Sequence, residues 1–220
     1  PEIRKAWMGG NIGNPLIVDL HEMQANDIAV VELSSFQTEL MTNAPQVSAI
    51  LNLAPNHLDR HGTMEAYTAA KANVLIHQDA ANIAILGRDD ETAYRLKDKV
   101  AGSFFSFGVD KPAVGENGTY VFNDTIMLQK DGQQIEFMPV STIEIPGPHN
   151  LQNVLAASAI AAAAGFPKEA IQAGVVGFGG VEHRLEFVRI ANGAKWFNDS
   201  KATTPKAVMM SINSFDEPIV

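Results

Sequence analysis

Cysteine is absent from this chain of 220 residues, and so is any long hydrophobic segment. The lack of cysteine excludes a disulfide-stapled scaffold and a cysteine-ligated metal site, and it is consistent with a reducing cytoplasm. The most hydrophobic stretch, LAASAIAAAAGF, is too short and too rich in alanine to span a bilayer. The N-terminal sequence PEIRKAWMGG lacks the pattern of a signal peptide. We therefore expect a cytoplasmic protein that is not embedded in a membrane.

Positive charge is also scarce, since 16 Lys and Arg residues face 25 Asp and Glu residues and the net charge is −9. This balance argues against general nucleic-acid binding, which requires a basic surface. It does not exclude an anionic ligand, because a local pocket of Arg, Lys and helix N-termini can hold a phosphate. Hydrophobic residues make up 46% of the chain, which is typical of a globular protein with a sizeable core.

The first half of the sequence has the pattern of an α/β fold. Short runs at residues 27–33, 46–53 and 82–87 are apolar on both faces, as in buried parallel strands. Residues 63–78 carry apolar side chains at helical spacing, with Thr63 as the expected N-cap. Strand, helix and strand joined by short loops predict a βαβ unit and a parallel sheet.

The pattern of polar and apolar residues changes in the middle of the chain. A helix is expected at residues 89–100, and residues 104–145 then alternate between polar and apolar in short stretches, with KDG as a hairpin signal between two of them. This pattern predicts an antiparallel addition to the sheet. Residues 147–166 form an alanine-rich helical segment with Gly165 as the expected C-cap and Pro167 opening the next helix.

A glycine-rich exit near Gly180 is the expected domain boundary. Residues 1–180 would then form one domain, and residues 181–220 would begin a second α/β domain with strand, helix and strand. The last of these strands is expected at residues 217–220. The sequence begins at Pro1 rather than at an initiator methionine, so we expect it to be a piece of a longer protein.

Polar side chains follow two of the predicted strands. Glu32 ends the first, before Ser34 and Ser35, and a carboxylate at a strand end suits Mg²⁺. His57 lies in the loop after the next strand, LNLAPNHLDRHG. If both strands belong to one parallel sheet, the two side chains face the same crevice. The alternative is that Glu32 points into water and the loop is polar only because it is exposed.

Three further features qualify as candidate sites. Lys71 lies among small and apolar residues in a helix, where an amine needs a partner or a modification unless it extends to the surface. GGNIG, at residues 9–13, combines glycines with a predicted helix start at Pro15. Asn150 and Asn153 share one face at a helix start, although Asn150 could serve only as an N-cap.

Six stretches together resemble the Mur ligase family of ATP-dependent amide-bond ligases, and they cover almost the whole chain in the family's order. They are GGNIGNP, ELSSFQTE, LNLAPNHLDRHGTMEAYTAAKANVL, GPHNLQNVLAA, VEHRLEF and NDSKATTP. The resemblance implies the family's central domain, a mostly parallel sheet flanked by helices with an antiparallel β addition, and the start of a Rossmann-like C-terminal domain. It is greatest to the member that adds D-glutamate to UDP-N-acetylmuramoyl-L-alanine in peptidoglycan biosynthesis.

Carried over residue by residue, the resemblance implies a catalytic set of Glu32, His57, Lys71 and Lys201. Glu32 and His57 resemble the ligands and orienters of a Mg²⁺ ion. Lys71 resembles the family lysine that reacts with carbon dioxide to form a carbamate, so that the modified side chain also supports the metal.

The resemblance assigns the substrates to different segments. Asn11 and His57 match residues that touch the UDP-sugar, with Ser34 beside it. Lys201 and Thr203 match contacts to D-glutamate. The implied ATP contacts are Asn150 and Asn153 at the adenine, Arg184 at the phosphates and Asp199 at the ribose.

The implied reaction proceeds through an acyl phosphate, with Mg²⁺ and cationic side chains stabilising the accumulating negative charge. The sequence departs from the family because it contains no G-x-x-x-x-G-K-[ST] phosphate loop. We therefore expect a fragment that is inactive by itself. We also expect it to be a monomer. The alternatives are a sibling Mur ligase, a folylpolyglutamate synthase-type ligase, or a non-catalytic nucleotide-sugar-binding module.

Overall fold

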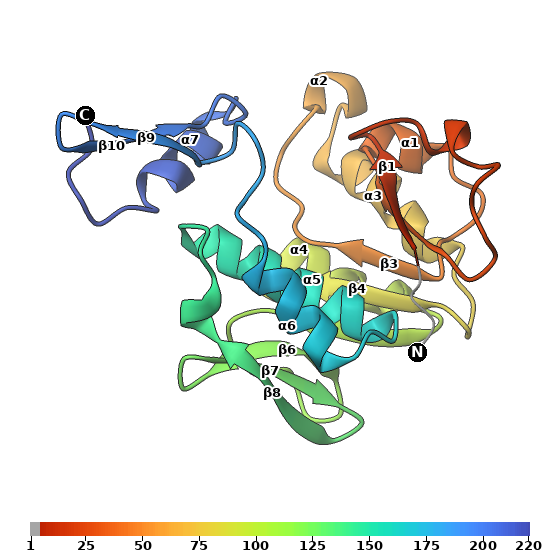
Figure 1. Cartoon of the computed structure of the whole chain (residues 1–220). Coiled ribbons are helices and arrows are strands. Elements are labelled where there is room, and N and C mark those ends of the chain that lie inside the picture. The colour runs from red at the N-terminus through yellow and green to blue at the C-terminus, as the bar shows by residue number, and fades with distance from the viewer. Residues whose placement is uncertain (1–4) are drawn as a thin grey trace. The chain divides into compact units, whose positions relative to one another are not determined.

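The computed structural model describes residues 5–220, without the side chain of Lys206, so expectations for residues 1–4 lie outside the described part. The chain forms two compact units, which are described separately (Figure 1). The first unit comprises Pro1–Pro45 and Ala54–Gln78, and the second comprises Gln46–Leu53 and Asp79–Val220.

The first unit is built around two parallel strands, β1 (Ala6–Gly10) and β2 (Ile28–Glu32). A 3₁₀ turn, η1 (Leu16–Val18), lies in the crossover between them. The helices are α1 (Ser35–Glu39), α2 (Leu58–His61) and α3 (Met64–Ile76), and α1 packs against α3. As predicted, Thr63 caps α3, its side chain accepting a hydrogen bond from the Ala66 backbone N–H at 3.2 Å.

The second unit contains a six-stranded sheet in the order β3-β4-β5-β6-β7-β8. The strands β3 (Val47–Ile50), β4 (Ile83–Gly87), β5 (Ser103–Phe107) and β6 (Asn117–Phe122) are parallel. The strands β7 (Thr125–Lys130) and β8 (Gln133–Pro139) add antiparallel pairs. The fold class expected from the sequence, a mostly parallel sheet with an antiparallel addition, is confirmed.

Two short turns in the second unit follow from local chemistry. Asp131 and Gly132 join β7 to β8 with φ angles of 51° and 79°, which is the left-handed backbone that a tight hairpin requires. The expected helix at 89–100 is instead split into α4 (Glu91–Tyr94), capped by Asp90, and the 3₁₀ helix η2 (Arg95–Lys99). A third 3₁₀ turn, η3 (Val140–Thr142), follows β8.

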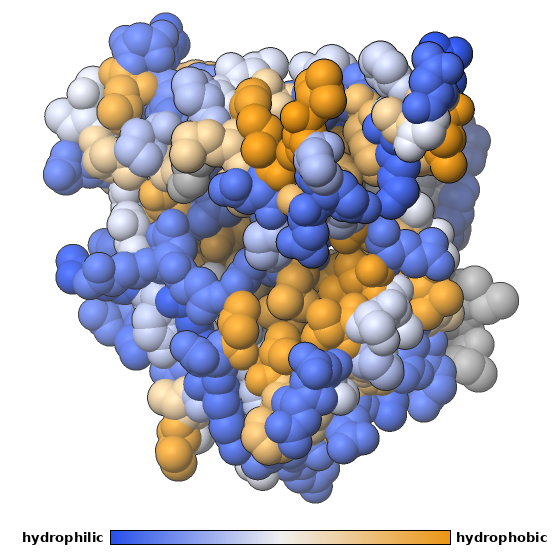
Figure 2. All heavy atoms as spheres, turned by 90° about the vertical axis from the view of Figure 1, so that its left-hand side faces the viewer, coloured by the Kyte–Doolittle hydropathy of each residue, from blue (hydrophilic) through white to orange (hydrophobic). Residues whose placement is uncertain are grey.

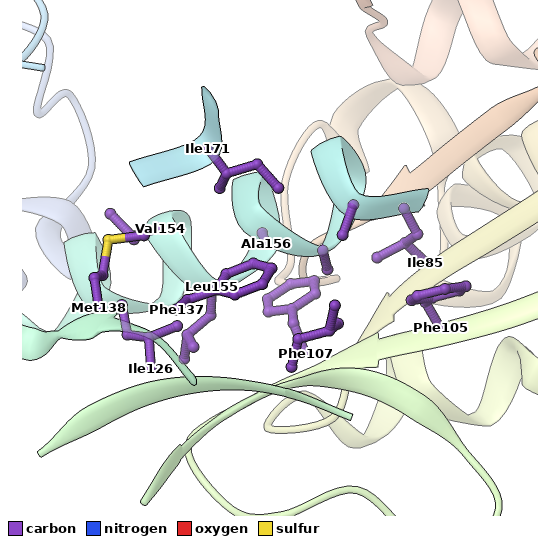
Figure 3. Close-up of a cluster of buried hydrophobic side chains, with 13 residues drawn as sticks. Ile85, Phe105, Phe107, Ile126, Phe137, Met138, Val154, Leu155, Ala156 and Ile171 are labelled. Carbon is purple, nitrogen blue, oxygen red and sulfur yellow. The ribbon is translucent and has the colours of Figure 1, made fainter. Parts of the chain in front are cut away.

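The core of the second unit lies between the sheet and α5 (Pro148–Ala163), with α6 (Lys168–Val176) packed on α5 (Figure 3). Ile85 and Leu155 are fully buried there, and burial of such a side chain contributes about 1.5–3 kcal/mol. The Thr119 hydroxyl donates to the Leu155 carbonyl oxygen at 2.7 Å, so a polar group at this contact is satisfied. This packing fixes α5 against the strands.

The C-terminal segment forms an antiparallel hairpin of β9 (Glu186–Ala191) and β10 (Ala194–Asn198), followed by α7 (Pro205–Ile212). Four large hydrophobic side chains of the hairpin are exposed, namely Phe187, Val188, Ile190 and Trp196. Figure 2 shows hydrophobic residues at the surface on the side of the molecule that it draws. The domain boundary near Gly180 stays a prediction.

Two expectations about strands are wrong. The runs at 27–33 and 46–53 do not share a sheet, because β2 pairs with β1 and β3 pairs with β4. Periodicity indicates a strand but not its neighbour, which is decided by backbone pairing. Residues 217–220 form no strand, because within residues 5–220 no ladder partner lies beside them.

Two helix ends also differ from expectation. The N-cap of α5 is Gly147, with φ of 102°, and Asn150 lies one turn inside the helix. The helix expected at Pro15 is only the three-residue η1. Gly165, the expected C-cap of α5, lies one residue beyond the C-cap Ala164, with φ of 84°. Pro167 is the N-cap of α6, so it opens that helix as predicted. No helix within residues 5–220 is both long and apolar enough to cross a bilayer.

Candidate functional site

Asn11 and Glu32 meet at the end of the parallel strands β1 and β2. The Asn11 backbone N–H donates to the Glu32 carbonyl oxygen at 2.8 Å, and its side-chain Nδ2 donates to Glu32 Oε1 at 3.1 Å. Gly10, with φ of 107°, permits this approach, because a Cβ there would lie 2.2 Å from the Glu32 carbonyl oxygen. The glycines of GGNIG therefore allow close backbone contact, and the Glu32 carboxylate is held at a strand end while exposed to solvent.

Lys71 extends from α3 toward the same strand end. Its Nζ donates to the Leu33 carbonyl oxygen at 3.1 Å, and the side chain is half-buried. Burial lowers the pKa of Lys71, and the negative charge of Glu32 opposes this by raising it. Lys71 therefore does not simply extend into water, because its amine has a hydrogen-bond partner and lies within electrostatic range of Glu32.

His57 begins α2 in a left-handed conformation, with φ of 52°. Its backbone N–H donates to Asn56 Oδ1 at 3.0 Å, and its ring centroid lies 5.1 Å from that of Phe36. The described residues contain no group of three His, Cys, Asp or Glu side chains placed to hold a metal. The structure thus brings Asn11, Glu32 and Lys71 together and sets His57 against Phe36 instead.

Ser34 acts as a helix cap. Its hydroxyl accepts a hydrogen bond from the Gln37 backbone N–H at 3.3 Å, and Gln37 Oε1 accepts one from the Ser34 backbone N–H at 2.9 Å. This capping box starts α1 at Ser35, three residues after Glu32. Ser34 therefore has a structural role in addition to the substrate role predicted for it.

The second unit contains the residues predicted to bind ATP. Asn150 is 7% exposed, and its Nδ2 donates to the Pro146 carbonyl oxygen at 2.7 Å. Asn153 is exposed, and its Nδ2 donates to Asn150 Oδ1 at 3.2 Å, so the two share one helix face as predicted. Asn150 therefore fastens the start of α5, while Asn153 keeps its own oxygen at the surface.

Backbone contacts join the two C-terminal stretches VEHRLEF and NDSKATTP. Asp199 Oδ1 accepts from the Leu185 backbone N–H at 3.1 Å, and Asp199 Oδ2 accepts from the Ser211 hydroxyl. The Lys201 backbone N–H donates to the His183 carbonyl oxygen at 3.0 Å. Arg184, Lys201 and Thr203 have exposed side chains. The hydrogen bonds between the two stretches therefore account for part of the clustering of polar residues in NDSKATTP.

His149 connects the start of α5 electrostatically to this C-terminal stretch. Burial lowers the pKa of His149, the positive charge of Arg184 lowers it further, and the negative charge of Asp199 raises it. The charges of Arg184 and Asp199 thus act on the turn that carries Asn150. Arg184 and Asp199 therefore both lie within electrostatic range of His149, the residue before Asn150.

Sequence reasoning gave no role to Asp89, the second residue after β4. Asp89 Oδ2 accepts hydrogen bonds from the Val109 backbone N–H at 3.0 Å and from the Gln152 side chain on α5. Asp89 therefore fixes the α5 turn that lies between Asn150 and Asn153. Its place at the carboxyl end of a parallel strand was the available signal, the same one that drew attention to Glu32.

Comparisons with known proteins identify the family of this chain. Residues 8–161 match the family described as the Mur ligase middle domain. The UDP-N-acetylmuramoylalanine–D-glutamate ligase of Caldanaerobacter subterraneus is 41% identical over 218 residues, which cover 99% of this chain and 47% of that protein. The ligase of the same name from Bacillus subtilis is 40% identical, with 99% and 47% covered.

Solved structures show the same fold. The MurF ligase of Thermotoga maritima in complex with ADP superposes with a TM-score of 0.67 at 17% identity, covering 96% of this chain and 50% of that one. The chain spans about half the length of the curated relatives it matches. Because the family match extends over residues 8–161, more than half of the sequence, this chain belongs to the Mur ligase family.

Proposed function

We propose that this chain is part of a cytoplasmic, monomeric ATP-dependent ligase that joins D-glutamate to UDP-N-acetylmuramoyl-L-alanine in bacterial peptidoglycan biosynthesis. Below, "the full-length protein" means a protein that contains this chain and is as long as its curated relatives. The observation that carries the proposal is the convergence of Asn11, Glu32 and Lys71 at one strand end. The ligases of known name that are 35–41% identical support the choice of substrates.

The proposed reaction requires stabilisation of negative charge on the reacting phosphate and carboxylate groups. A substrate carboxylate oxygen attacks the γ-phosphorus of ATP, the bond to the bridging oxygen breaks, and ADP leaves. The D-glutamate amine then attacks the acyl carbon, phosphate leaves, and the amine loses a proton. The first step brings negative groups together, so cationic side chains such as Arg184 and Lys201 are the groups expected to stabilise the accumulating charge.

Glu32 fits a Mg²⁺ site, because an exposed carboxylate at a strand end is a hard oxygen ligand. An unmodified Lys71 is a donor only and cannot be a ligand. A carbamate on Lys71 would present oxygen atoms instead, near the Glu32 carboxylate whose charge it already senses. We propose that Glu32, His57 and a carbamylated Lys71 support Mg²⁺, which would neutralise phosphate charge when bound.

The remaining roles complete the proposal. Asn11, Ser34 and His57 would contact the UDP-sugar, and Lys201 and Thr203 would contact D-glutamate. Asn150, Asn153, Arg184 and Asp199 would hold ATP, and the neighbour from Thermotoga maritima in complex with ADP supports a nucleotide in this fold. His149 senses the charges of both Arg184 and Asp199, which supports a common ATP site for them.

Phosphate release tests this function directly. We expect the full-length protein to release phosphate from ATP only when UDP-N-acetylmuramoyl-L-alanine and D-glutamate are both present, because the carboxylate of the first is needed to form the acyl phosphate and the amine of the second is needed to displace phosphate from it. The measurement is steady-state phosphate release with each component omitted in turn, and L-glutamate and other amino acids serve as controls. Equal turnover with another amino acid would identify a sibling ligase, and binding of the nucleotide sugar without turnover would identify a binding module.

A further inference from the structure

We infer that His61 is a positioning residue that holds the His57 turn in place relative to the segment after Glu32. His61 lies in the first unit, at the end of the one-turn helix α2. The inference rests on the proposed function for its kinetic consequence, whereas its structural content can be measured without any turnover.

The first link runs through the backbone. The His61 N–H donates to the His57 carbonyl oxygen at 3.0 Å, and Gly62 N–H donates to the Leu58 carbonyl oxygen at 2.8 Å. These bonds close the turn that leaves His57 at a φ of 52°. A four-residue helix has too few hydrogen bonds to be stable alone, so the turn needs an anchor outside itself.

The second link is the His61 side chain. Its Nε2 lies 2.9 Å from the Ser35 hydroxyl oxygen, a hydrogen bond whose direction depends on the tautomer. Ser35 is 2% exposed and is the first residue of α1. This bond therefore joins the end of α2 to the start of α1, three residues after Glu32.

The third link is aromatic. The His61 ring stacks on Phe36, with centroids 5.3 Å apart and planes 7° apart, and it meets the buried Tyr67 ring edge-on at 5.5 Å. Phe36 also contacts the His57 ring at 5.1 Å. The Phe36 ring thus lies against both histidines, so the position of His61 limits where the His57 ring can lie.

These contacts converge on the predicted catalytic segment. The residues after β2 carry Leu33, whose carbonyl oxygen accepts from Lys71, and Ser35, which bonds His61. One short segment is therefore held on one side by Lys71 and on the other by His61. Loss of the His61 contacts would free the His57 turn without removing any group proposed to touch substrate.

The test uses the full-length protein with ¹³C-labelled histidine. His61→Ala removes both links of the side chain, and His61→Phe keeps an aromatic ring but loses the bond to Ser35. Ser35→Ala removes the same bond from the other partner, so it carries the test if His61→Ala does not fold. His77→Ala is the control, because His77 is an exposed residue at the end of α3 in the same unit.

We expect His61→Ala to shift the His57 ring resonances, because the Phe36 ring is released, while His77→Ala leaves them in place. The turnover number should fall roughly tenfold to a hundredfold, as for displaced catalytic groups. His61→Phe and Ser35→Ala should show equal effects that do not add in the double variant, because both remove one bond.

Unshifted His57 resonances in His61→Ala, or additive effects in the double variant, would overturn the inference. Full turnover of His61→Ala would overturn it as well. If the parent protein shows no D-glutamate-dependent turnover, the proposed function fails, and the resonance shift still decides the positioning role of His61.

Discussion

Two opposing effects act on the pKa of Lys71. Burial lowers its pKa and the Glu32 charge raises it, with burial the larger effect. Between this lowered pKa and the unfolded value of about 10.4, the folded chain binds fewer protons than the unfolded chain, so stability rises with pH there. The neutral amine, which is the form that adds carbon dioxide, is therefore more abundant than for a lysine in water.

Replacement of Lys71 tests the carbamate. We expect Lys71→Ala in the full-length protein to lose nearly all ligase activity and to remain folded, and a small carboxylic acid should restore part of the activity by occupying the vacated position. Lys71→Arg should be inactive, because a guanidinium keeps its charge and forms no carbamate. The measurements are phosphate release with and without the acid, and circular dichroism for the fold. Parent-like activity of Lys71→Ala would rule out the carbamate role.

At the scale of elements, the start of α5 places a buried asparagine one turn before an exposed one on the same helix face. The buried Asn150 satisfies the Pro146 carbonyl oxygen, whereas Asn153 is exposed one turn further along the same face. Asp89 adds a second fastening through Gln152. A rigid helix start is what a site for a nucleotide base would need.

Replacement of Asn150 and replacement of Asn153 should have different effects on stability. Asn150→Ala is expected to lower the free energy of unfolding by about 0.5–1.5 kcal/mol, because the partly buried hydrogen bond to the Pro146 carbonyl oxygen is lost. Asn153→Ala should change it by less than about 0.5 kcal/mol, as at most exposed sites. Both should raise the KM for ATP in the full-length protein. Urea denaturation and initial rates provide the two measurements, and an unchanged KM in Asn153→Ala would contradict its contact with ATP.

At the scale of the whole molecule, residues 8–161 match the family's middle domain, and the chain spans about half the length of its curated relatives. It contains no G-x-x-x-x-G-K-[ST] sequence to surround the phosphates of ATP.

We therefore expect the 220-residue chain alone to show no ATP-dependent ligation. The physical reason is that nothing else in its sequence supplies a phosphate-binding loop of that kind. Incubation of the purified chain with ATP, UDP-N-acetylmuramoyl-L-alanine and D-glutamate, followed by mass spectrometry of the products, measures this. Ligated product above the level of a protein-free control would show that the residues described here suffice for phosphate binding.

Much of the fold and site could be read from local pattern. Runs apolar on both faces indicated the parallel strands, Thr63 and Gly165 marked helix ends, and KDG marked the hairpin of β7 and β8. Each of these signals depends on residues close together in the chain, where backbone geometry and solvent exposure leave few choices. Glu32 and Lys71 became candidate site residues in the same way, from a strand end and from an amine in an apolar setting, and their roles stay predictions.

Only the tertiary structure decided which strands pair and which side chains meet. It placed β2 beside β1 rather than beside β3, set His57 against Phe36, and showed Asn150 one turn inside its helix. It also revealed the contacts of His61 with Ser35 and of Asp89 with Gln152. These contacts join residues 26 and 63 positions apart, respectively. Hydrophobic periodicity records only whether a face is buried, and the partner that buries it is chosen by packing and hydrogen bonding across the folded chain.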